Sequence, residues 1–268
     1  MKLMLLTGNP EFAKKAENCG VDRIFLDLEY INKAERQMGR NTYITQNTVY
    51  DVMPLRKALI KSELLVRVNP INPLSKQEID MVCEQGADLV MLPMVYDAED
   101  VRSFVRLVGG RAKTVPMIET PQALSRIDEI LEVEGVDELY IGLNDLHIGM
   151  GLTFMFELLS GGVVEYLAEK IKAKGISFGF GGMAKIGEGV LPAENILAEH
   201  IRLGSSSVIL SRTFRNEVDA EGKKVLDLEL EISKIRSKEK EISNWGQAQF
   251  EENRQAVVKT VREIANKL

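Results

Sequence analysis

Short apolar runs alternate along the chain with segments in which apolar residues recur every three or four positions. The runs lie at residues 3–7, 22–28, 64–69, 88–95, 114–119, 137–143, 176–180 and 206–211. Near-continuous apolar runs of this length are typical of parallel strands that are buried on both faces. The segments between them have helical periodicity, and several end at a glycine just before the next run, as at Gly204.

Eight such strand–helix units predict an α/β fold of the (β/α)₈ TIM-barrel type. The main rival is an open, doubly wound sheet, which more often carries a glycine-rich dinucleotide turn after its first strand. Residues 6–10 read Leu-Thr-Gly-Asn-Pro and do not match that turn. We therefore expect the barrel.

The C-terminal part of the chain has a different pattern, because from Gly222 it is strongly charged and helical. A first apolar stripe predicts the eighth barrel helix, so that a catalytic barrel domain spans residues 1–242. A second stripe, after a capping signal at Ser243, predicts an extra helix within 243–268 that packs on its own barrel or on a neighbouring subunit. We expect a homo-oligomer. The stripes consist of Val225, Leu228, Ile232 and Ile235, and of Val257, Val261, Ile264 and Leu268.

Composition narrows the class of protein. The 268 residues are 45% hydrophobic and 28% charged, which is ordinary for a globular enzyme with a sizeable core. The net charge of −6 argues against nucleic acid as a main partner. No apolar run approaches the roughly 20 residues that span a membrane. Cys19 and Cys83 suggest neither a disulfide nor a zinc site, so a cytoplasmic protein with free thiols is expected.

Two carboxylates, Glu119 and Asp145, follow successive predicted strands. In a barrel of this kind the carboxyl ends of the strands meet at one mouth, where active sites lie. Arg67 interrupts an otherwise apolar strand that ends at the same mouth. Several acids with almost no histidine suit Mg²⁺ or Mn²⁺, with Co²⁺ also possible, better than zinc. The pattern therefore predicts a divalent-metal site for an anionic substrate.

Five ordered phrases resemble the HpcH/HpaI aldolase and citrate lyase β-subunit family, whose members are pyruvate-type TIM barrels. The resemblance extends over residues 1 to about 215. Any one phrase is weak, but the ordered set is fairly specific. The phrases are residues 22–29 (DRIFLDLE), 65–69 (LVRVN), 86–94 (GADLVMLPM), 116–120 (PMIET) and 135–142 (GVDELYIG), the last followed by Asn144-Asp-Leu.

The resemblance implies a metal-dependent carbon–carbon lyase that cleaves or forms a 2-keto-4-hydroxy acid through a pyruvate enolate. Glu119 and Asp145 match the family's metal ligands, and Arg67 matches the arginine that contacts the keto acid. Backbone amides near Asn144 would hold the substrate carboxylate. A citryl- or malyl-CoA-type lyase and a relative that binds metal and keto acid without catalysis remain alternatives.

The chain departs from the family at the position after the acidic pair of the second strand. Many aldolases have a histidine there for proton transfer, whereas this chain has Tyr30. Many also have a glutamine two residues before the glutamate ligand, whereas this chain has Met117. The proton acceptor is therefore open between metal-bound water, Glu29 and Tyr30.

Other positions can be interpreted either as functional or as purely structural. Gly181 offers a backbone N–H to a substrate carboxylate or phosphate, and tight packing explains it equally well. Arg212 is a similar candidate for substrate binding. His147 and His200 are expected at the surface rather than in the site. Arg36 and Arg40 belong to a long polar segment that is better explained as a solvated loop.

Overall fold

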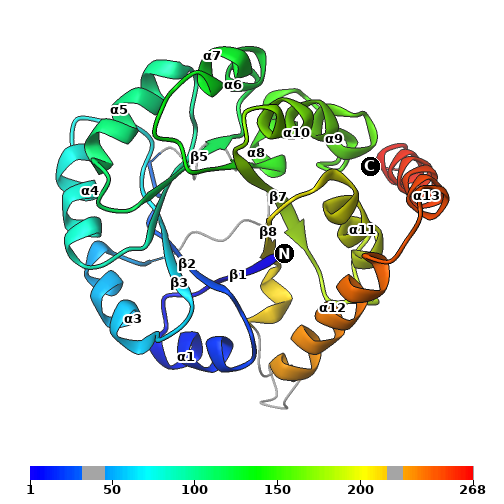
Figure 1. The fold of residues 1–268 in the computed structure, drawn as a ribbon, viewed down its shortest axis with the longest axis horizontal. Helices are drawn as coiled ribbons and strands as arrows, with labels where there is room; N and C mark the ends of the chain where they lie inside the picture. Colours follow the sequence, from blue (N-terminus) through cyan, green and yellow to red (C-terminus); the bar gives the residue numbers. More distant parts are fainter. Residues whose placement is uncertain (32–45, 216–225, 268) are drawn as a thin grey trace.

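Eight parallel strands form a closed barrel in the computed structural model, which describes residues 1–31, 46–215 and 226–267 (Figure 1). Each strand pairs with its neighbours in chain order, and the last strand closes onto the first. The predicted TIM barrel and all eight predicted strands are confirmed. The strands are β1 (Lys2–Leu6), β2 (Arg23–Asp27), β3 (Glu63–Arg67), β4 (Leu89–Leu92), β5 (Lys113–Ile118), β6 (Glu138–Ile141), β7 (Ser177–Met183) and β8 (Ser207–Leu210).

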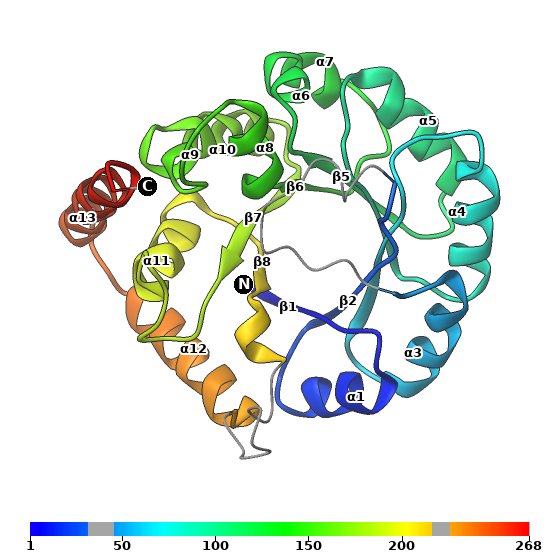
Figure 2. The same cartoon turned by 180° about the vertical axis from the view of Figure 1, so that it is seen from behind.

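A ring of helices covers the outside of the barrel (Figure 2). Local signals in the sequence set their ends: the Asp97 side chain caps the first turn of α5, and Gly204, with φ of 76°, ends α11. The helices are α1 (Pro10–Asn18), η1 (Val49–Asp51), α3 (Val52–Ala58), α4 (Ser75–Glu84), α5 (Ala98–Val108), α6 (Pro121–Ser125), α7 (Ile127–Leu131), α8 (Leu143–Gly149), α9 (Glu157–Ser160), α10 (Val163–Ala173), α11 (Ala193–Leu203), η2 (Arg212–Phe214), α12 (Leu228–Ile242) and α13 (Gln247–Ala265).

The side-chain alternation of β2 and β3 builds the barrel interior in layers. Arg23 pairs in register with Glu63 at the amino end, and Phe25 pairs with Leu65 in the middle. The buried Arg23 guanidinium also contacts both carboxylate oxygens of Glu138, at 2.9 and 3.0 Å. Apolar side chains, including Phe25 and Leu65, fill the middle layer. The next inward position therefore lies at the open, carboxyl end of the strands.

The second C-terminal stripe packs on the barrel of its own chain. Helix α13 lies outside α11 in both views (Figure 1, Figure 2). Val257 and Val261 are buried, and Asn253 donates to the Glu199 carboxylate of α11. The helix begins after Gly246 rather than at Ser243, because the Gln249 side chain accepts a hydrogen bond from the Gly246 N–H. The predicted homo-oligomer stays a prediction. Val225 and Leu268 of the two stripes lie outside the described residues.

The expected exposure of His200 was wrong, since this side chain is fully buried in α11. Its ring stacks on Phe180 of β7 with centroids 3.7 Å apart, and Nδ1 lies 2.9 Å from the Ser205 hydroxyl. In the described part of the chain, Nε2 has no hydrogen-bond partner. Helical periodicity put the residue on a helix but could not show which face meets the sheet.

We expect His200 to make the protein sensitive to acid. Burial lowers the pKa of His200 from 6.5 to about 3, with a smaller contribution from the N-terminal charge. The unfolded state therefore binds more protons between these values, and stability falls as the pH drops below 6.5. One pKa unit corresponds to about 1.4 kcal/mol, so roughly 2 kcal/mol should be lost near pH 5. Urea unfolding of wild-type and His200→Phe proteins across this range checks the effect; equal slopes against pH would contradict it.

Candidate active site

Arg67 is held at the mouth of the barrel by two acids from the end of β2. Asp27 faces it in register, and the two form a bidentate pair with both N–O distances at 2.9 Å. The Glu29 carboxylate lies 3.4 Å from Nη2 of the same guanidinium. Both acids are almost fully buried. Burial disfavours the charged guanidinium, but the two carboxylates outweigh this and raise the pKa of Arg67.

Glu119 follows β5 and is buried on the neighbouring side of the mouth. Its Oε1 accepts a hydrogen bond of 2.8 Å from the Met94 backbone N–H. Burial first, and then repulsion by Asp145 and Glu29, raise the pKa of Glu119 to about 8, although Arg67 opposes this shift. The site thus gathers more carboxylate charge than one guanidinium neutralises. That imbalance is the electrostatic setting that a bound cation would relieve.

Two backbone positions set the place of Glu119. Met94 has φ of 52°, a left-handed conformation that is uncommon for a side chain of this size. This strained turn directs its N–H at the glutamate, which is the kind of site where such strain is found. At the end of the neighbouring strand β6, a Cβ at Gly142 would lie 2.7 Å from the Cβ of Glu119. The glycine therefore leaves the room that the Glu119 side chain occupies.

Glu119 and Asp145 line one cavity of about 280 Å³. Among the residues that the structure describes, no group of three or more His, Cys, Asp and Glu side chains could share a metal ion. Two carboxylates still fit Mg²⁺ or Mn²⁺, because such ions are commonly bound through one or two carboxylates while waters or substrate complete the shell. The raised pKa of Glu119 agrees with a site that lacks positive charge.

The other predicted site residues are distributed around the mouth. Asn144 lies beside Asp145 in the first turn of α8. Tyr30 is 63% exposed and lines a separate cavity rather than the one with Glu119. The Gly181 carbonyl accepts a 2.6 Å hydrogen bond from the Tyr140 hydroxyl, and a Cβ there would meet Leu143 at 2.8 Å, so packing accounts for the glycine. Arg212 is exposed in η2.

The expected exposure of His147 was also wrong. Its side chain is buried in α8, and Nδ1 lies 3.1 Å from the Leu143 carbonyl one turn earlier. The residues after β6 form a helix here instead of the expected loop, which turns the imidazole inward. Arg36 and Arg40 lie outside the described residues.

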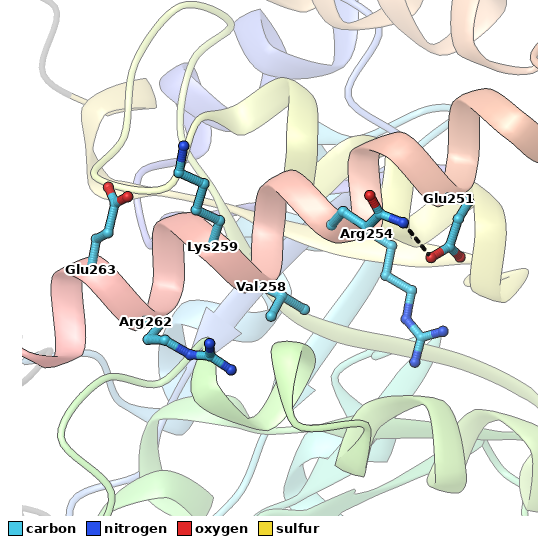
Figure 3. A pocket seen from close by; sticks show the side chains of 7 residues that line it. Glu251, Arg254, Val258, Lys259, Arg262 and Glu263 are labelled. Carbon is cyan, nitrogen blue, oxygen red and sulfur yellow. Dashed lines mark hydrogen bonds between the residues drawn. The ribbon is translucent and has the colours of Figure 1, made fainter.

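Cavity size alone would not identify this site. A cavity of about 480 Å³ runs along α13, away from the strand ends, and is lined by side chains of that helix (Figure 3). It contains Arg254, Arg262 and Glu263 among others, but none of the buried acids of the barrel mouth. The chemistry of the lining residues therefore favours the smaller cavity.

Sequence reasoning assigned no role to Asp27, Met94 and Gly142. The signal for Asp27 was present, because it lies two residues before Glu29 and so shares its face of the strand. The left-handed turn at Met94 and the closeness of Gly142 to Glu119 are tertiary features. No local pattern in the sequence marks either of them.

Gly142→Ala is expected to weaken metal binding without altering a ligand. The added methyl collides with Glu119 and lies 3.1 Å from the Met117 methyl, so the carboxylate must move. Overpacking of this kind costs about 1–3 kcal/mol of stability. Calorimetric titration with Mn²⁺ and urea unfolding measure both effects. Gly246→Ala is the matched control, because no atom lies within 4 Å of its Cβ position; equal Mn²⁺ affinity in the two variants would contradict the prediction.

The closed barrel and its acidic mouth define an α/β-barrel protein with a candidate site at the carboxyl ends of the strands. The sequence model of the HpcH/HpaI aldolase/citrate lyase family matches residues 2–159, more than half of the chain. The chain therefore belongs to the HpcH/HpaI aldolase/citrate lyase family.

Individual relatives are more distant. A pyruvate kinase of Methylorubrum extorquens is 30% identical over 129 residues, which cover 48% of this chain and 27% of that protein. The 2-keto-3-deoxy-L-rhamnonate aldolase of Escherichia coli K12 is 27% identical over 182 residues, covering 56% and 61%. The chain thus spans less than two thirds of either relative. An HpcH/HpaI aldolase structure from Desulfitobacterium hafniense aligns with a TM-score of 0.60 and 17% identity, over 92% of this chain and 94% of that one.

None of the helices in the described ranges combines the length and the apolar character that crossing a bilayer requires.

Proposed function

We propose that the protein is a divalent-metal-dependent aldolase that cleaves or forms a 2-keto-4-hydroxy acid through a pyruvate enolate. The observation that carries this proposal is the set of acids at the barrel mouth: the buried Glu119 and Glu29 act on the single guanidinium of Arg67, and the half-buried Asp145 lies close enough to Glu119 to raise its pKa. Cleavage of the bond between C3 and C4 leaves its electron pair on the pyruvate fragment as an enolate. Such a reaction needs fixed positive charge at the keto oxygen and a base at the 4-hydroxyl.

Glu119 and Asp145 would hold the metal ion, Mg²⁺ or Mn²⁺. When bound, the ion supplies Lewis-acid stabilisation of the developing enolate charge. Arg67 adds a second positive charge beside the same oxygen, and its pair with Asp27 fixes the guanidinium before substrate arrives. The first turn of α8, with Asn144, offers backbone N–H groups to the substrate carboxylate. Gly181 and Arg212 remain candidates for substrate binding at the rim.

Glu29 is the side chain that best suits the role of proton acceptor. It is buried beside Arg67 and interacts electrostatically with Glu119, whereas Tyr30 points to a different cavity and is largely exposed. Glu29 would take the 4-hydroxyl proton as the aldehyde leaves, and in the synthetic direction it would return that proton.

Exchange of the methyl protons of pyruvate with solvent deuterium tests this function. Incubation with Mg²⁺, Mn²⁺ or Co²⁺ should give metal-dependent loss of the methyl signal in proton NMR, because formation of the enolate exchanges that proton. Glu29→Gln should still bind the metal but should no longer release pyruvate from a hydroxy keto acid. Folded wild-type protein that exchanges no protons with any of the three metals would reject the aldolase and favour a relative that only binds.

A second candidate is a lyase that acts on a citryl- or malyl-CoA-type ester. A cavity of about 440 Å³ at the end of β1 favours it, because this cavity is lined by Thr7, Asn9, Asn47 and Arg215 and could receive a distal polar group. Coenzyme A should then compete with the ester substrate but not with pyruvate. If coenzyme A has no effect, the CoA-ester lyase is rejected and the 2-keto-4-hydroxy acid aldolase is retained.

A further inference from the structure

The side chain of Asn69 holds the short segment that carries Glu29. Its Oδ1 accepts hydrogen bonds from the N–H groups of Tyr30 and Ile31, at 3.0 and 3.1 Å. Its Nδ2 donates to the Leu28 carbonyl at 3.3 Å. The Leu28 carbonyl belongs to the peptide group before Glu29, and the Tyr30 N–H belongs to the one after it. One amide side chain therefore fixes both peptide groups that border Glu29.

Glu78 of α4 holds this amide in turn. Its Oε1 accepts a 2.8 Å hydrogen bond from Nδ2 of Asn69, and its Oε2 accepts one of 3.2 Å from the Asn69 backbone N–H. An amide flipped by 180° would turn its oxygen toward this carboxylate, so the observed orientation is strongly preferred. Asn69 is 3% exposed, and its amide oxygen and nitrogen each have two partners.

We propose that Asn69 and Glu78 form a clamp that positions Glu29 against Arg67, and that this clamp determines the rate of the enolate chemistry. The inference rests on the proposed function, because it assigns to the pair the orientation of the proposed proton acceptor. Asn69 and Glu78 are positioning residues, since neither lines the cavity of Glu119 and Asp145.

The clamp matters because it holds the side of the Glu29 segment that lies beyond the end of β2. Two further hydrogen bonds at this segment run from the Leu28 N–H to the Arg67 carbonyl, at 2.9 Å, and from the Glu29 N–H to the Asp27 carboxylate, at 3.1 Å. These bonds fix the start of the segment, whereas Asn69 fixes its far side. Without the clamp, Tyr30 and Ile31 would lose the acceptor of their N–H groups, and the Glu29 carboxylate could leave the guanidinium. A misplacement of about 1 Å at a reacting group can cost roughly 10²-fold in rate.

The test uses the full-length protein with Mn²⁺ and a 4-hydroxy-2-keto acid, because Glu29 is proposed to take the 4-hydroxyl proton. Asn69→Ser removes the clamp, and Glu78→Gln is the conservative variant that keeps one acceptor for Asn69. Gln77→Ala is the matched control, from an exposed position on the same helix. We expect the rate of pyruvate release to fall by roughly 10²-fold in Asn69→Ser, less in Glu78→Gln, and not at all in Gln77→Ala. Mn²⁺ affinity should stay unchanged, since the proposed ligands are Glu119, which follows β5, and Asp145 of α8.

Amide hydrogen exchange supplies a readout that does not depend on activity. In Asn69→Ser and Glu78→Gln the amides of Tyr30 and Ile31 should exchange faster than in the wild type. Unchanged protection of these amides would refute the clamp, and lost protection with an unchanged rate would refute its role in positioning. If Asn69→Ser does not fold, Glu78→Gln decides by the same two measurements. Wild-type protein that does not exchange the methyl protons of pyruvate in the presence of metal would instead refute the proposed function.

Discussion

Glu119→Gln is expected to lower Mn²⁺ affinity by at least the roughly 10–100-fold that loss of a residue supporting a metal ligand costs. The amide still accepts the Met94 N–H but offers the ion no negative charge. Turnover should be lost together with the metal. Calorimetric titration measures the affinity, and Glu99→Gln, an exposed acid on α5, is the control. Equal Mn²⁺ affinity in Glu119→Gln and wild-type protein would contradict the assigned ligand.

The same residue predicts how metal and pH are linked. Because the pKa of Glu119 is raised from 4.5 to about 8, the metal-free folded protein binds more protons than the unfolded chain between these values. The contribution of Glu119 to the free energy of unfolding is fully present below pH 4.5 and is lost as the pH rises through 8. If Glu119 is a metal ligand, Mg²⁺ should take the place of that proton and should raise Tm more above the pKa of Glu119 than below it. In Glu119→Gln this difference should vanish.

Arg67→Met is expected to lower the free energy of unfolding by about 3–5 kcal/mol, because it leaves buried carboxylates without their partner. Asp27 and Glu29 are each only 2% exposed in their side chains. Urea unfolding measures the loss. Arg102→Met removes an exposed pair with Glu99 and should cost no more than about 1 kcal/mol.

A second substitution separates charge from packing. If unpaired charge causes the loss, Asp27→Asn should restore part of the stability in the Arg67→Met background, since the amide is neutral and nearly the same size. A double variant as unstable as the sum of both single changes would show that the guanidinium acts mainly by filling space.

The sequence predicted the barrel well because both faces of each strand are buried. Apolar runs such as residues 89–92 are a direct consequence of that burial, and the glycine after α11 marks a helix end by its backbone conformation. The sequence also predicted the extra helix but not its first residue. Ser243 resembles an N-cap, whereas the hydrogen bond to the Gln249 side chain makes Gly246 the cap.

The sequence predicted the site residues only where their position at or just after a strand places them at the mouth of the barrel. Arg67 ends β3, Glu119 directly follows β5, and Asp145 lies in the first turn of the helix after β6, so the fold alone brings them to one mouth. The exposure of Tyr30 and the burial of His147 depend on how a segment turns after its strand, and the burial of His200 depends on which face of α11 meets the sheet. The hydrogen bonds between Asn69 and the Glu29 segment join residues about 40 positions apart, and no local pattern in the sequence predicts such a pairing.

An anomalous difference map from crystals grown with Mn²⁺ and pyruvate is the most direct test of the central claim, that Glu119 and Asp145 bind a divalent ion at the substrate site. One strong peak is expected between these two carboxylates, with pyruvate density beside Arg67. A peak bound by other side chains, or pyruvate located away from Arg67, would contradict it.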